Sequence, residues 1–72
     1  MDHPFKVGDI LWTYLPYERK IVKFKVVKST KTRVTIEDEN GNRRVRAPSL
    51  QNGKWYVFVD IEIGCVEKED IK

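Results

Sequence analysis

The most constraining feature of the chain is a series of short segments in which apolar and charged residues alternate. Within residues 21–29, Phe24 and Val26 alternate with Lys23 and Lys25, which is the two-residue period of a half-buried β-strand. No window before residue 65 repeats its apolar residues at the three- and four-residue spacing of an amphipathic helix. We therefore expect an all-β fold.

Turn chemistry divides the chain into five expected strands. Pro16 and Pro48 end two of them, because proline has no N–H to donate to a strand ladder. Asn40-Gly41 predicts a hairpin, because this pair tolerates positive φ, whereas residues 49–53 are expected to form a turn or a single turn of helix. The expected strands are residues 10–15, 21–29, 32–37, 43–47 and 54–63. Five strands about ten residues apart are typical of a small barrel, which leaves no exposed sheet edges.

The length limits the chain to one domain, residues 1–72, because 72 residues hold material for a single core. The acidic tail, residues 65–72, has three open interpretations: a final edge strand, one helical turn or a frayed end. The amino terminus lacks the basic and then apolar order of a secretory signal, and no apolar run approaches the ~20 residues of a membrane span. These features predict a cytoplasmic protein with no membrane association.

Few residues of the chain are suited to catalysis. Cys65 is the only cysteine, which is typical of a reducing compartment, and we expect it to be a buried or half-buried small hydrophobe. His3, the only histidine, is expected to be solvated near the terminus. No Cys/His spacing indicates zinc, and the glycines are too scattered for a phosphate-binding loop. We expect no enzymatic activity, catalytic residue, metal, cofactor or small-molecule substrate.

The basic charge is concentrated in the middle of the chain. The formal net charge is +3, yet residues 19–46 hold ten Lys and Arg against three acidic residues, a net of +7. The segments before and after each carry a net charge of −2. This distribution predicts an interaction face in the central segment.

Two segments carry a resemblance to a known group of domains. Residues 5–12, Phe-Lys-Val-Gly-Asp-Ile-Leu-Trp, resemble the opening of SH3-like barrels of the Tudor, chromo-barrel and KOW type. The resemblance continues through residues 34–42, Val-Thr-Ile-Glu-Asp-Glu-Asn-Gly-Asn, then Val45 and Leu50, and covers about residues 5–50. It implies a single five-stranded SH3-like barrel with a short carboxy-terminal tail.

The resemblance does not extend to the methyl-reading function of some Tudor domains. Those domains hold a methylated Lys or Arg in an aromatic cage, because an electron-rich ring attracts a poorly hydrated cation. Here the cage positions fall near Leu15, Val22 and Glu39, none of which is aromatic. We therefore do not expect this chain to read methylated side chains.

The strand pattern predicts one basic outer face, built from three adjacent strands. Its expected members are Lys23, Lys25, Arg33, Arg44 and Arg46. Such a face attracts phosphates through counterion release and charge-assisted hydrogen bonds, and nearby aromatic residues would stack on unpaired bases. The aromatic candidates are Tyr14, Tyr17 and Tyr56. KOW-type barrels, many of which bind RNA or ribonucleoprotein, favour the same interpretation. We expect non-catalytic binding of DNA or RNA, and the alternative is that these side chains only solvate the barrel.

A second hypothesis treats the domain as a protein-interaction or adaptor module. Tyr56 and Phe58 alternate with Trp55 and Val57, so they lie on the opposite side of their strand. If nothing covers them, they form an apolar patch for a protein partner or a homodimer. An accessory factor of a phage or mobile element would fit this hypothesis. The other interpretation is that one bent strand serves two sides of a single core.

Overall fold

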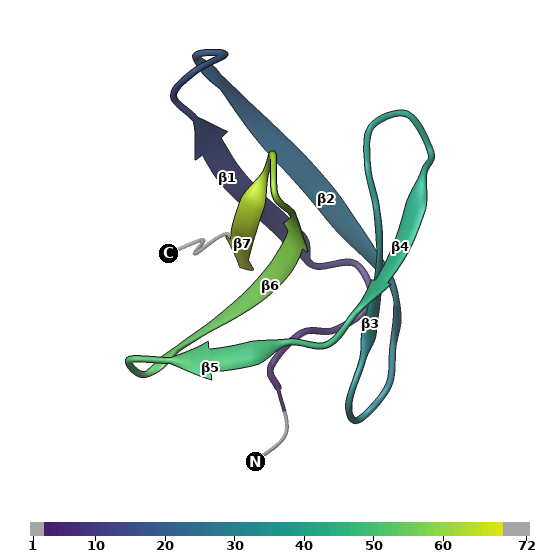
Figure 1. Ribbon diagram of the computed structural model, residues 1–72. Coiled ribbons are helices and arrows are strands. Elements are labelled where there is room, and N and C mark those ends of the chain that lie inside the picture. The colour runs from purple at the N-terminus through teal and green to yellow at the C-terminus, as the bar shows by residue number, and fades with distance from the viewer. Residues whose placement is uncertain (1–2, 69–72) are drawn as a thin grey trace.

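The computed structural model describes residues 3–68 and folds them into one antiparallel sheet of seven strands, with no helix in that range (Figure 1). The strands are β1 (Ile10–Leu15), β2 (Lys20–Ser29), β3 (Val34–Glu37), β4 (Arg43–Arg46), β5 (Ser49–Gln51), β6 (Lys54–Asp60) and β7 (Gly64–Lys68). Their order in the sheet is β4-β3-β2-β1-β7-β6-β5. The all-β prediction is confirmed, although the sheet has seven strands where five were expected.

The two additional strands lie where the sequence predicted a turn and a tail. β5 occupies part of residues 49–53, and it pairs with β6 through a two-residue turn at Asn52 and Gly53, both with positive φ. β7 lies within the expected tail, but it pairs with β1 on one side and β6 on the other. The tail is therefore not an edge strand. Residues 69–72, to which the tail prediction also applies, lie outside the described residues.

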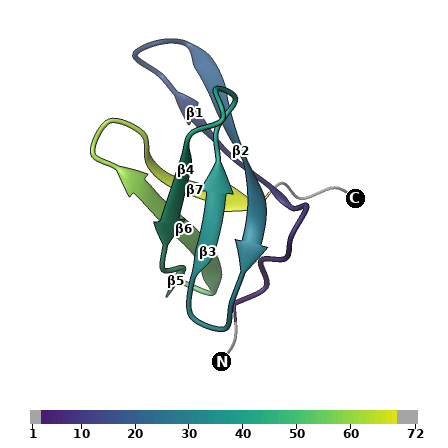
Figure 2. The same ribbon diagram turned by 90° about the vertical axis from the view of Figure 1, so that its right-hand side faces the viewer.

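The sheet curls into a half-barrel whose two edge strands are consecutive in the chain. β4 and β5 are joined only by Ala47 and Pro48, and the curl brings β4 against β6, as Figures 1 and 2 show. The inner side of the curl holds the buried core: Phe5, Leu11, Phe24, Val26, Val34, Ile36, Val57, Val59 and Val66.

The segment before β1 closes one side of this core. Phe5 is only 2% exposed, and its carbonyl accepts a hydrogen bond from Ser29 Oγ at 2.8 Å. His3 Nε2 donates to the carbonyl of Thr30 at 2.6 Å, while its Nδ1 accepts from the backbone N–H of Phe5. His3 is thus half-buried and bonded on both ring nitrogens, so the expectation of a solvated histidine is wrong. None of residues 3–68 belongs to a helix that could span a membrane.

Candidate functional site

The strand register assigns each candidate side chain to one of two faces of the sheet. Residues directly opposite on neighbouring strands share a face, and Leu11 lies opposite Phe24, both of them buried. Their side is the inner face, and the opposite side is the outer face. Trp12, the next residue of β1, lies opposite Lys23, so these two side chains share the outer face.

Three lysines lie along the outer face of β2, and we call them the lysine row: Lys23, Lys25 and Lys28. All three are exposed, and none forms an ion pair with another of residues 3–68. Lys23 and Lys25 lie where the sequence placed them. Lys28 was missed, because strict alternation turns it inward. A bulge between Val26 and Lys28 shifts the register and sets Lys28 opposite Thr35 on the outer face.

Arg44 and Arg46 do not join the lysine row. Arg44 lies opposite Ile36, and Arg46 lies opposite Val34, and both of these partners are buried on the inner face. The prediction that five basic residues share one outer face is therefore wrong. On β4 the usual pattern is inverted, because Val45 turns outward and is 52% exposed.

The two inward arginines instead bridge the open side of the half-barrel. Arg46 Nε donates to the carbonyl of Val59 on β6 at 3.1 Å, and Arg44 Nη2 lies 3.7 Å from Asp60 Oδ2. Both side chains are partly exposed at the edge of the sheet, where a long side chain can lie along apolar residues and keep its charge near water. Assigning every charged residue to the outer face overlooked this edge.

Arg33 lies apart from the strand faces. It occupies the turn between β2 and β3, where its carbonyl accepts hydrogen bonds from the N–H and the hydroxyl of Thr30. Its side chain is exposed, and so is that of Lys31 in the same turn. Arg33 thus adds positive charge beyond the Lys28 end of β2.

Aromatic side chains lie beside the lysine row on the outer face. A cross-strand series runs from Lys23 to Trp12 on β1, then to Glu67 on β7 and Tyr56 on β6. Tyr14 shares the outer face and is 51% exposed. The sequence analysis missed Trp12, although its position two residues before Tyr14 carries that information.

Phe58 and Cys65 are cross-strand neighbours on the same outer face. Phe58 is 50% exposed, so no second layer covers this strand, and Cys65 is exposed rather than buried as expected. Tyr17 lies elsewhere, in the β1–β2 loop, and it is fully exposed. Of the four proposed aromatic contacts, Tyr14, Tyr56 and Phe58 thus share a face, and Tyr17 does not.

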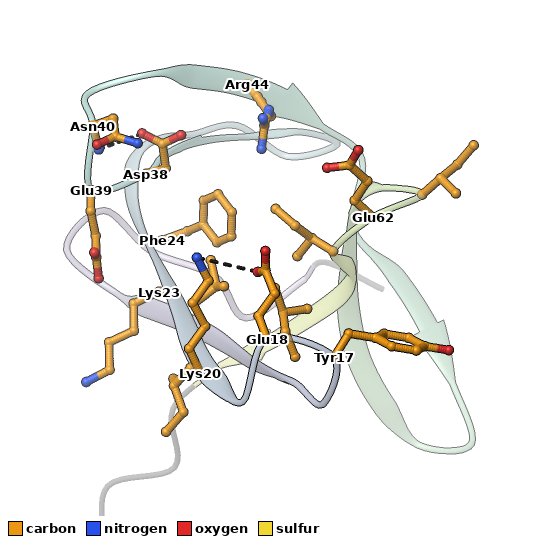
Figure 3. A pocket seen from close by; sticks show the side chains of 15 residues that line it. Tyr17, Glu18, Lys20, Lys23, Phe24, Asp38, Glu39, Asn40, Arg44 and Glu62 are labelled. Carbon is orange, nitrogen blue, oxygen red and sulfur yellow. Dashed lines mark hydrogen bonds and ion pairs between the residues drawn. The ribbon is translucent and has the colours of Figure 1, made fainter.

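A pocket of about 810 Å³, which we call the end pocket, opens at one end of the half-barrel (Figure 3). Three connections surround it: β1–β2, β3–β4 and β6–β7. Leu15, Val22 and Glu39, the positions to which the resemblance pointed as a cage, all line this pocket. Without aromatic side chains at these positions, it has no aromatic cage.

The charged groups of the end pocket are of both signs. Arg44 extends into it from β4, and Glu18 and Lys20 form an ion pair of 3.4 Å at its rim (Figure 3). Asp38 accepts hydrogen bonds from the backbone N–H groups of Asn42 and Asn40 at 3.0 and 2.8 Å. The bond from Asn42 is the main cause that lowers the pKa of Asp38 below its ordinary value. The Asp38 carboxylate therefore holds the β3–β4 turn.

Comparison with known proteins supplies no relative for this chain. No protein-family model matches it, and no curated protein and no solved structure matches it either. Within residues 3–68, no three His, Cys, Asp or Glu side chains gather as ligands for a metal ion.

Proposed function

We propose that the outer face of β2, β1 and β6 binds single-stranded nucleic acid without catalysing a reaction. The observation that carries the proposal is the direct opposition of Lys23 and Trp12 across the β1–β2 ladder. It sets an unpaired cation beside an aromatic ring on an exposed sheet surface. Proteins that bind single strands without sequence preference combine these two elements, a cationic track for the backbone and aromatic rings for the bases.

The lysine row supplies the cationic track. Lys23, Lys25 and Lys28 lie within six residues of one strand, a length of roughly 17 Å at about 3.3 Å per residue, and Lys31 and Arg33 extend the charge past its end. These side chains are free to contact phosphates because their charges are not neutralised by neighbouring carboxylates. Binding through them releases counterions and depends steeply on salt.

Trp12, Tyr14, Tyr56 and Phe58 supply the stacking surface. Stacking of a base on an aromatic side chain contributes about 1–3 kcal/mol and tolerates any base. Glu67 lies between Trp12 and Tyr56, so phosphates are expected to follow β2 while the bases extend over β1. The curled sheet is compatible with an SH3-like barrel, and the resemblance to the RNA-binding KOW type supports the same proposal.

The test is binding of fluorescent dT12 and rU12 to the whole chain, measured by anisotropy at 50 and 200 mM salt. We expect binding at 50 mM that weakens steeply at 200 mM. Lys23→Gln is expected to weaken it. Lys54→Gln, an exposed lysine at the start of β6, is the matched control and should leave it unchanged. Absence of binding at 50 mM would refute the proposal.

A second candidate function is docking of a protein partner on the same face. The observation that favours it is the exposure of Tyr14, Ile21 and Phe58, each about half exposed on the outer face. Burial of such a patch is largely insensitive to salt. Sedimentation at 1 M salt tests for a homodimer, and loss of the dimer in Phe58→Asp would support this candidate.

A further inference from the structure

The end pocket contains a guanidinium whose hydrogen-bonding capacity is incompletely used. Arg44 Nη1 is buried and has no hydrogen-bond partner within residues 3–68. The contact of Nη2 with Asp60 is 3.7 Å long, which is an ion pair rather than a hydrogen bond. An unpartnered buried donor is uncommon in folded proteins, because its lost hydration is not replaced. A ligand with acceptor atoms would replace it.

The other pocket residues restrict the chemistry of this ligand. The floor is apolar and includes Val22, Phe24 and Ile63. Glu62 lies on the same side of the pocket as Arg44, and both charged groups are directed inward (Figure 3). Four carboxylates against three basic side chains line the pocket, so a free anion is disfavoured. A planar, neutral group with both acceptors and donors on its edge fits better.

Guanine has this combination. Its O6 and N7 accept two hydrogen bonds from one arginine, and its N1–H and N2–H groups donate to a carboxylate such as that of Glu62. Its ring faces pack on apolar side chains, and Tyr17, fully exposed at the rim, offers a ring for stacking. Lys23 belongs both to the lysine row and to the pocket lining, so a strand on the outer face passes the mouth of the pocket.

We propose that the end pocket binds one unpaired guanine base through Arg44 and Glu62. This inference rests on the proposed function, because it takes the base from the strand that lies along the lysine row. It makes a weakly selective surface selective for strands with an accessible guanine.

The first experiment compares dT12 with dT12 that carries one central guanine, by fluorescence anisotropy. The wild type is expected to bind the guanine-containing strand about tenfold more tightly, the scale of one good bidentate contact. Glu62→Gln and Tyr17→Ala change exposed residues and should abolish this preference, with dT12 binding unchanged. Glu39→Gln, whose carboxylate lies at the far rim in Figure 3, is the matched control and should retain it. Equal affinity of the wild type for both strands overturns the guanine inference and leaves the proposed function standing.

A second experiment tests the pocket without the strand. Titration of the whole chain with guanosine monophosphate should shift the amide NMR signals of Arg44, Glu62 and Ile63, whereas cytidine monophosphate should not. If dT12 does not bind but guanosine monophosphate shifts these signals, the proposed function fails and the pocket assignment stands. If neither nucleotide shifts them, the pocket assignment is wrong.

Discussion

Arg46 Nε donates a hydrogen bond to the carbonyl of Val59, 3.1 Å away, and so connects β4 to β6 where these two strands do not pair. The curled sheet leaves this side open, because its order places β4 and β5 at opposite edges. A side chain thus takes the place of a backbone ladder between β4 and β6. Arg46, which the sequence suggested as a nucleic-acid contact, is in the structure a stabilising residue of the open side.

Replacement of Arg46 by alanine is therefore expected to destabilise the fold. The change removes a charge-assisted hydrogen bond and leaves the Val59 carbonyl without this donor, a loss of about 1–3 kcal/mol. Arg43→Ala is the matched control, because Arg43 is exposed and its ion pair with Glu37 lies at the surface, where such pairs contribute about 0–1 kcal/mol. Urea unfolding measures both. An Arg46→Ala protein as stable as wild type, but with weakened nucleic-acid binding, would return Arg46 to the binding residues.

Much of the fold follows from local sequence, and the comparison of two Asn-Gly pairs shows where prediction stopped. Asn52-Gly53 has positive φ at both residues, 51° and 79°, and forms the two-residue hairpin between β5 and β6. The sequence analysis used this signal at Asn40-Gly41 and not here. At Asn40-Gly41 only Gly41 has positive φ, because the turn is longer and Asp38 organises it.

Other features were beyond local patterns. The bounds of β1 were predicted correctly at residues 10–15, because an apolar run ends at a proline. β7 buries only Val66 completely, and its partners β1 and β6 are chosen by the curl of the whole sheet. The inward direction of Arg44 likewise depends on pairing with Ile36. The candidate site was therefore only half predicted, with Lys23 and Lys25 placed correctly and the arginines of β4 misplaced.

Gly53→Ala is expected to destabilise the protein by about 1–2 kcal/mol. Gly53 has φ of 79°, a left-handed conformation that costs an L-residue with a Cβ about this much. Gly53→Asn is the matched control, since asparagine visits this region more readily, and it should be less destabilising. Urea unfolding checks the order. Equal loss in both variants would show that the side-chain volume, and not the backbone conformation, matters at this turn.

The stability of the β3–β4 turn is expected to fall in acid because of Asp38. The pKa of Asp38 is lowered in the folded protein, chiefly by the hydrogen bond from the Asn42 N–H. A lowered folded pKa means that this contribution is fully present above the unfolded value of 3.8. It is lost as the pH falls through the folded value. Unfolding measured from pH 6 to pH 2 should show this loss.

Asp38→Asn is the control for this pH dependence. The amide oxygen still accepts from the backbone N–H groups of the turn but does not titrate. Its unfolding curve should therefore lack the part of the acid response that Asp38 contributes. NMR titration of the Asp38 carboxyl carbon gives the direction of its pKa independently, and a pKa at or above 3.8 would contradict the prediction.

Replacement of Lys23 and Lys25 together by glutamine is expected to change the salt dependence of nucleic-acid binding in a countable way. Each phosphate contact contributes about 0.7 to the slope of log K against log salt for a single strand. Loss of both lysines should thus lower the slope by about 1.4. Arg44→Gln, which removes an inward charge held near Asp60, should leave the slope for dT12 unchanged. If Arg44→Gln lowers the slope as much as the lysine pair does, phosphates reach the inner edge of β4, and the outer face is not the binding surface.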